Sequence, residues 1–149
     1  MSYSVFAIEE MLTDCVALEY ILLGDLRDLL EETPDKRDCK WLMAVLDTLL
    51  ETLPKEDELQ ENGGGYLSEV VENFPNWSGE VDRLQQKRYE LYEKLSSLRY
   101  RISSHRSFSQ IAEEVRLDLK DWMQAFVAQN RHECRILQNA FNLDVGIGD

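Results

Sequence analysis

The sequence predicts an all-α protein, an antiparallel up-down-up-down bundle of four helices in a single domain that spans residues 1–149. Apolar residues recur at steps of three and four through long stretches, which lines them up along one face of a helix. The chain also has only three prolines and seven glycines, and two of the prolines lie near expected helix ends. Because the links between the periodic stretches are short, consecutive helices should pack as antiparallel neighbours.

The first helix is expected over residues 4–32. Its apolar stripe contains Ile8, Met11 or Leu12, Cys15, Leu18 or Glu19, Leu22, Leu26 and Leu29. The segment Thr33-Pro34-Asp35 should end this helix. Asp35 or its neighbour is placed to cap the next helix, because a short carboxylate there accepts hydrogen bonds from free backbone N–H groups.

The second helix has a stripe made of Leu42, Val45, Leu46, Leu49, Leu50 and Leu53. Pro54 falls inside this pattern, and a proline lacks the backbone N–H and clashes with the carbonyl four residues earlier. We therefore expect a kink or a break near Leu53. A further turn or two should follow over residues 55–62, before the triplet Gly63-Gly64-Gly65 stops the helix.

A short amphipathic helix is expected over residues 66–73, where Phe74-Pro75 breaks it. The third long helix should begin at a cap supplied by Asn76 or Ser78 and reach Ile102. A serine-rich link then leads to the fourth long helix.

The fourth long helix is expected over residues 109–142, followed by a tail, residues 144–149, that is not helical by composition. Two polar residues, Gln129 and Glu133, interrupt its seam, which reads Ile111, Val115, Leu119, Trp122, Phe126, Gln129, Glu133, Ile136 and Ala140. Residues four apart share a helix face, so this pair is expected inside the bundle.

The third long helix carries a cation within its apolar seam, which reads Val81, Leu84, Arg88, Leu91, Leu95, Leu98 and Ile102. Burial of a guanidinium is unfavourable unless anions meet it inside the protein. We expect Arg88 to be the internal counter-ion of Glu61 and Glu133. The alternative is that Arg88 reaches past the seam to water and that the carboxylates are exposed.

Charge and cysteine content restrict the function classes. The chain has 29 acidic and 16 basic residues, a formal charge of −13, which disfavours binding to nucleic acid or to anionic membrane surfaces. It has neither a transmembrane stretch nor a basic segment followed by an apolar run. Cys15, Cys39 and Cys134 form no zinc-binding spacing, so we expect reduced, mostly buried thiols and a cytoplasmic location.

Several segments together resemble the hemerythrin-like (HHE cation-binding) family. They are Glu61 to Leu67, Pro75, Val81 to Arg88, Glu133 to Gln138 and the terminal Ala140 to Asp149. The resemblance covers nearly the whole chain from about Leu18 onward. It implies a four-helix bundle that holds two iron ions with histidines and carboxylates and that binds or senses oxygen, nitric oxide or iron.

This chain departs from the family pattern at the metal ligands, since the carboxylates are kept and four histidines are missing. On the second helix, the resemblance places one pair of ligand positions at Asp57 and Glu61. If the register shifts by one residue, the pair falls on Glu56 and Gln60 instead. His105 lies in a serine-rich loop and His132 lies off the ligand face, so neither is expected to bind metal. The cluster predicted at the former metal site contains Tyr20, Asp57, Glu61, Arg88, Gln129 and Glu133.

The leading functional interpretation is a metal-free, degenerate member of this family that acts as a non-catalytic sensory or interaction module without a cofactor. No nucleophile–base pair or phosphate loop indicates an enzyme. One alternative is an iron-binding oxygen or redox sensor that uses Tyr20, Asp57, Glu61 and Glu133, which requires Arg88 to point away. Another is an acidic secretion or assembly chaperone that captures a partner helix. The protein partner or small ligand and the oligomeric state stay open.

Overall fold

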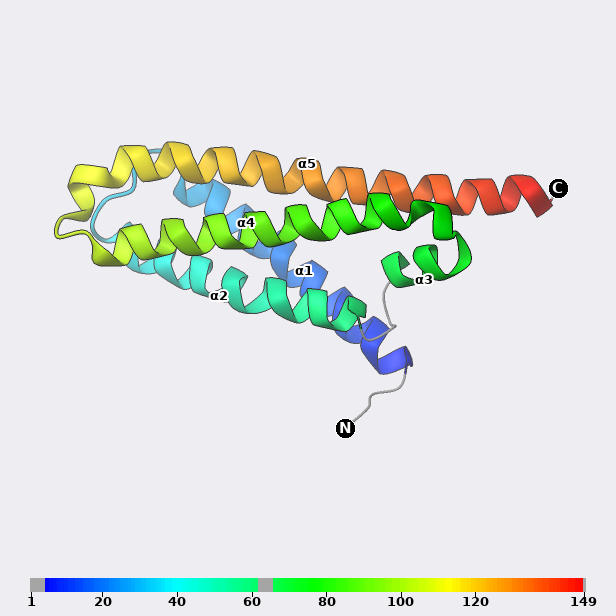
Figure 1. Cartoon of the computed structure of the whole chain (residues 1–149). Coiled ribbons are helices and arrows are strands. Elements are labelled where there is room, and N and C mark those ends of the chain that lie inside the picture. Colours follow the sequence, from blue (N-terminus) through cyan, green and yellow to red (C-terminus); the bar gives the residue numbers. More distant parts are fainter. Residues whose placement is uncertain (1–4, 62–65, 149) are drawn as a thin grey trace.

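A computed structural model describes the backbone of residues 5–61 and 66–148, and the side chains of residues 6–61 and 67–140. The elements are α1 (Val5–Leu29), α2 (Asp38–Leu59), α3 (Tyr66–Asn73), the short 3₁₀ helix η2 (Pro75–Trp77), α4 (Ser78–Ser104) and α5 (Phe108–Gly148). Within these residues every regular element is a helix (Figure 1). The predicted all-α class is therefore confirmed, and the short helix over residues 66–73 is found where it was expected.

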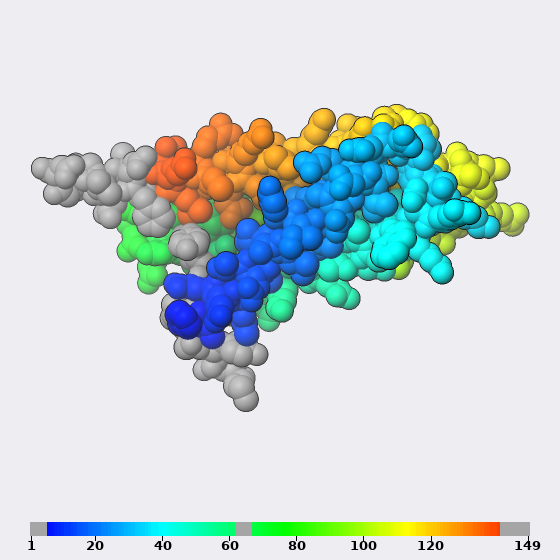
Figure 2. Space-filling view, turned by 180° about the vertical axis from the view of Figure 1, so that it is seen from behind, coloured from blue at the N-terminus to red at the C-terminus, as the bar shows by residue number. Residues whose placement is uncertain are grey.

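The four long helices form two hairpins. The links after α1 and α4 are short, and each helix packs against the next, α1 on α2 and α4 on α5. Contacts between α2 and α4 join the hairpins, while α3 packs near the start of α4 and against α5. Figure 2 shows α1 lying diagonally across one face, close to α5 near the α1–α2 link and farther from it toward the N-terminus.

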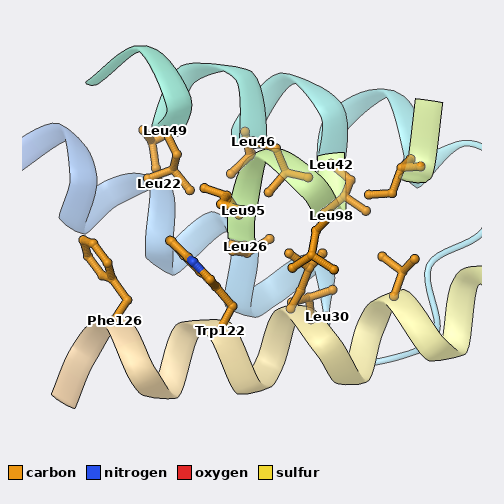
Figure 3. Packing of buried hydrophobic residues seen from close by; sticks show 14 of the residues in the cluster. Leu22, Leu26, Leu30, Leu42, Leu46, Leu49, Leu95, Leu98, Trp122 and Phe126 are labelled. Carbon is orange, nitrogen blue, oxygen red and sulfur yellow. The ribbon is translucent and has the colours of Figure 1, made fainter. Parts of the chain in front are cut away.

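At the end that holds the two links, side chains from all four long helices make one core. We call this region the closed half (Figure 3). Trp122 lies at its centre, fully buried, with its ring stacked on Phe126 at 5.1 Å between ring centroids. The indole N–H donates to the carbonyl of Leu91 at 2.8 Å, so the one polar atom of this side chain is satisfied. The core contains Leu22, Leu26, Leu30, Leu42, Val45, Leu46, Leu49, Leu53, Leu91, Leu95, Leu98, Ile102, Val115, Leu119, Trp122 and Phe126.

Toward the N-terminus of α1 the hairpins separate, and the buried apolar residues divide into two clusters. We call this region the open half. One cluster joins α1 to α2 and contains Ile8, Leu12, Cys15 and Leu59. The other joins α3, α4 and α5 and contains Leu67, Val70, Val81, Leu84, Ile136 and Ala140. The space between the hairpins is thus left to polar side chains.

The start of α2 behaves as predicted. The carboxylate of Asp35 accepts hydrogen bonds from the backbone N–H groups of Arg37 and Asp38, at 2.8 and 2.9 Å. These bonds hold the pKa of Asp35 below its usual value, because they stabilise the ionised form.

Of the predicted kink or break near Leu53, the break is wrong, because α2 runs without interruption from Asp38 to Leu59 with Pro54 inside it. The kink stays a prediction. Pro54 is exposed, and the carbonyl of Leu50 one turn earlier lies on the same side of the helix, where water can replace the missing donor. The glycine triplet that was expected to stop the helix lies outside the described residues.

The predicted non-helical tail is also wrong, because the backbone of α5 stays helical as far as Gly148. Glycine costs roughly 1 kcal/mol in a helix relative to alanine. An established helix nevertheless gains one backbone hydrogen bond for each residue added, whereas starting a new helix is unfavourable. A composition rule applied to residues 144–149 alone overlooks this propagation.

Candidate functional site

The polar cluster is centred on Arg88, midway along α4, where its side chain points between the two hairpins. Arg88 is only 8% exposed. Its Nη2 donates to Oε2 of Glu56 at 2.7 Å and its Nε donates to Oδ1 of Asp57 at 2.7 Å, both carboxylates lying on α2. Its Nη1 donates to Oε2 of Glu133 on α5 at 3.3 Å. One guanidinium therefore ties three carboxylates from two helices to a third helix.

The charge on Arg88 is held by these neighbours. Burial alone would lower the pKa of the guanidinium, but the three carboxylates outweigh burial and raise that pKa above its usual value. Burial has the larger effect on two of the acids, since it raises the pKa of Asp57 and of Glu133 although the guanidinium lowers both. With its three partners ionised, the cluster carries more negative than positive charge.

A fourth carboxyl comes from α1. Glu19 is 5% exposed and faces Glu56. Burial first, and then the hydrogen bond with Glu56 and the charge of that residue, raise the pKa of Glu19 to about 9. At neutral pH Glu19 is therefore protonated and donates its O–H to Glu56. Its other oxygen, Oε1, is buried and has no hydrogen-bond partner among the described residues.

Two pockets flank the cluster. Carboxylates shared with Arg88 line both of them, so the cluster forms the partition between the pockets. The smaller pocket, about 150 Å³, lies beside α2 and α4 and is lined by Asp57, Gln60, Glu61, Leu67, Gln85, Arg88, Tyr89 and Glu133. The larger, about 350 Å³, is lined from α1, α2 and α5 by Glu9, Leu12, Thr13, Val16, Glu19, Glu56, Gln60, Asn130, Glu133, Cys134 and Leu137.

The structure brings together three of the six predicted cluster residues, Arg88, Asp57 and Glu133. The prediction is wrong for Tyr20, which is 80% exposed, and for Glu61, which is exposed just beyond the end of α2. Adjacent helical residues point about 100° apart. At this point of α1 it is Glu19 that faces the interior, whereas Tyr20 points toward solvent.

Gln129 is buried as predicted, but it serves the backbone. Its Nε2 donates to the carbonyl of Leu84 at 3.0 Å, which links α5 to α4 one turn from Arg88. His105 is exposed, as expected. His132 is also exposed, with Nε2 3.9 Å from Oε2 of Glu80.

The expectation for the thiols holds in part. The described cysteines form no disulfide, and Cys15 is buried and Cys39 half-buried. Burial raises the pKa of both thiols. Cys134 departs from the expectation, because it is exposed at the rim of the larger pocket.

Two members of the cluster, Glu19 and Glu56, are missing from the predicted set. The spacing Ile8, Leu12, Cys15, Glu19, Leu22, Leu26 contains the signal for Glu19, since a carboxyl there occupies a core position just as Arg88 does. Glu56 belongs to the alternative register of the second helix, and the structure uses Glu56 and Asp57 together because Arg88 reaches both.

The donors around Arg88 do not suit the two iron ions that the family resemblance implies. Imidazoles are missing from the cluster, and a guanidinium lies among the carboxylates, where it would repel a metal cation. In the described part of the chain, no three histidine, cysteine or acidic side chains are grouped to hold a metal ion.

Comparisons with known proteins add no family assignment. No protein-family model, curated protein or solved structure matches this chain. The hemerythrin-like assignment therefore stays a prediction. None of the helices in residues 5–61 and 66–148 is long and apolar enough to span a bilayer.

Proposed function

We propose that this chain is a metal-free, non-catalytic sensory or interaction module with the antiparallel four-helix topology of hemerythrin-like proteins. In this proposal Arg88 supplies the positive charge that metal supplies in that family. The observation that carries this proposal is that all three guanidinium nitrogens of Arg88 donate hydrogen bonds to carboxylates, two of them at 2.7 Å. The cation of the site is thus supplied by the chain itself.

Electrostatics favours this reading over metal binding. A bidentate or multidentate guanidinium satisfies carboxylate oxygens as a cation would, and it stays charged at every accessible pH. The iron-binding alternative uses Tyr20, Asp57, Glu61 and Glu133 and requires Arg88 to point away. Arg88 instead contacts two of these residues, and Tyr20 lies on the surface.

Metal analysis tests the proposal directly. Protein produced with added iron and purified without chelator should contain well below one iron per chain and show no oxo-bridge absorption. A matched Arg88→His variant should take up more metal than the wild type, because it removes the cation and restores an imidazole. Two iron ions per wild-type chain with an oxo-bridge band would contradict the proposal.

One observation favours the chaperone as a second candidate function. Val16 and Tyr20, one turn apart on α1, are 52% and 80% exposed, and Phe6 and Ile21 are exposed on the same helix. Such a surface could receive the apolar side of a partner helix. The chaperone function predicts that a dye for apolar surface binds the wild type and binds a Val16→Ser/Tyr20→Ser variant much less. Equal dye binding by the two proteins would remove this candidate.

A further inference from the structure

The larger pocket of the open half is a candidate ligand site. Its volume of about 350 Å³ lies within the range of roughly 300–1,000 Å³ that is typical of small-molecule sites. Leu12, Val16 and Leu137 give it apolar walls on α1 and α5. Figure 2 looks onto the face where these two helices diverge.

Carboxyl groups gather at one side of this pocket. Glu19, Glu56 and Glu133 all line it, each from a different helix. Glu19 is 95% buried, since only 5% of it is exposed, and its Oε1 has no partner among the described residues. An unpaired buried acceptor is unfavourable, so a ligand that donates a hydrogen bond to it would relieve a cost already present in the free protein.

We propose that this pocket binds a small organic cation, a protonated amine attached to an apolar body. The ammonium group lies against Glu19, Glu56 and Glu133, and the apolar body lies between the walls formed by Leu12, Val16 and Leu137. This inference deepens the proposed function and rests on it, because the module gains a ligand class only if metal does not fill the cluster.

Charge selects the cation. The carboxylates outnumber the one guanidinium that they share, so an anionic ligand would be repelled and a cation attracted. Arg88 lies beyond these carboxylates and lines the smaller pocket on the other side. An ammonium group has three N–H donors and no acceptor, which matches a group of carboxyl oxygens contributed by three helices.

A second acidic pocket lacks these properties and supplies the control. It lies between the end of α1 and the start of α2, is about 750 Å³ in volume, and is lined by acids that include Asp25, Glu31 and Glu32. These three side chains are exposed. Salt screens exposed charges strongly, so amine binding to this second pocket should be weak and nonspecific.

The test uses 2-phenylethylammonium, with 2-phenylethanol and phenylacetate as neutral and anionic analogues, in calorimetric titrations at about 0.15 M salt. The amine should bind saturably at one site per chain. The alcohol should bind at least about tenfold more weakly and phenylacetate not at all, because only the cation gains charge-assisted hydrogen bonds.

Three variants locate the binding site. Glu19→Gln should weaken amine binding at least about tenfold. The positive charge of the bound ammonium favours the ionised form of Glu19, whose proton leaves to solvent, whereas the amide cannot become an anion. Val16→Trp should block the pocket from a partly exposed position without loss of folding. Glu31→Gln in the second acidic pocket should leave the affinity unchanged. The rate at which a thiol reagent modifies the exposed Cys134 should fall when the amine is present.

Two results would overturn the inference. One is the absence of saturable amine binding, and the other is equal weakening by Glu19→Gln and Glu31→Gln, which would indicate binding by surface charge alone. Metal content measured on the same preparation separates the two proposals. A metal-free protein that fails to bind the amine overturns only the inference, whereas iron in the cluster overturns the proposed function.

Discussion

The closed and open halves of the molecule are held together by different interactions, apolar packing in the first and ion pairs in the second. In the closed half, leucines and Trp122 from four helices fill one core, and the indole N–H has a backbone acceptor. In the open half the hairpins separate, two small apolar clusters replace the single core, and Arg88 bridges the gap by ion pairs. Packing is insensitive to pH, whereas the bridge depends on which carboxyls are ionised.

This difference shows where the chain can respond to its surroundings. A continuous core of leucines has one stable arrangement and offers no group that titrates or binds ions. The cluster in the open half contains four carboxyl groups, of which one, Glu19, is neutral at neutral pH, and a pocket lies beside them. Rigid support and a responsive site are thus separated along the same four helices.

The largest expected effect is at the bridge. Arg88→Leu leaves buried carboxylates without their counter-ion and should lower the free energy of unfolding by about 3–5 kcal/mol near neutral pH, the usual cost of breaking a buried ion pair. A denaturant titration measures this loss. Arg83→Leu on the exposed side of α4 is the matched control and should change stability by no more than about 0.5 kcal/mol. Matching midpoints for Arg88→Leu and the wild type would end the counter-ion hypothesis.

The corresponding change in the closed half is Leu46→Ala. Leu46 is fully buried, and loss of its side chain should cost about 2–5 kcal/mol through lost apolar burial and the cavity that remains. The loss should be the same at acidic and at neutral pH. The loss for Arg88→Leu should shrink on acidification, because Asp57 and Glu133 have raised pKa values and become neutral. If both variants showed the same pH dependence, the two halves would not differ as proposed.

Glu19 should give the stability of the wild type a distinctive pH slope. Its pKa is about 9 in the folded state and its ordinary value is 4.5, so between these values the folded chain binds a proton that the unfolded chain has lost. Its contribution to stability is therefore full below pH 4.5 and declines as pH rises toward about 9. Each pH unit in this window costs up to about 1.4 kcal/mol.

Glu19→Gln should remove that slope, because the amide mimics the protonated carboxyl at every pH. Unfolding curves at about pH 6 and pH 8 should show the variant gaining stability over the wild type as pH rises. Glu56, Asp57 and Arg88 still surround the position in both proteins. Glu10→Gln on the exposed side of α1 is the control and should keep the slope of the wild type. An unchanged slope in Glu19→Gln would show that the carboxyl is not held neutral.

Sequence periodicity is sufficient for the helices and for Arg88, because a seam position is a property of one helix and its spacing. The partners of Arg88 depend on how separate helices meet, which spacing alone does not determine. The stripe of α1 can be drawn through Leu18 or through Glu19, and only packing against α2 decides for Glu19. The separation of the hairpins has the same origin, since it follows from contacts between residues far apart in the sequence.

The family pattern is less informative than the seam at this site. It selects Tyr20 and Glu61 by alignment with ligand positions, and both lie on the surface. It also selects Asp57 and Glu133, which do contact Arg88. Carboxylates at those two positions are explained by the need to neutralise a buried guanidinium, a requirement that does not extend to the other positions.

The smallest expected effect distinguishes the neighbours Glu19 and Tyr20. Tyr20→Phe removes the hydroxyl of a side chain that is 80% exposed, so the free energy of unfolding should change by no more than about 0.5 kcal/mol at any pH. Its stability should also have the pH slope of the wild type, because the hydroxyl has no place in the cluster. A denaturant titration beside that of Glu19→Gln provides the comparison. A loss of about 1 kcal/mol or more in Tyr20→Phe would indicate that the phenol lies inside the bundle. The helix α1 would then have to be rotated about its axis so that Tyr20, and not Glu19, faces the interior.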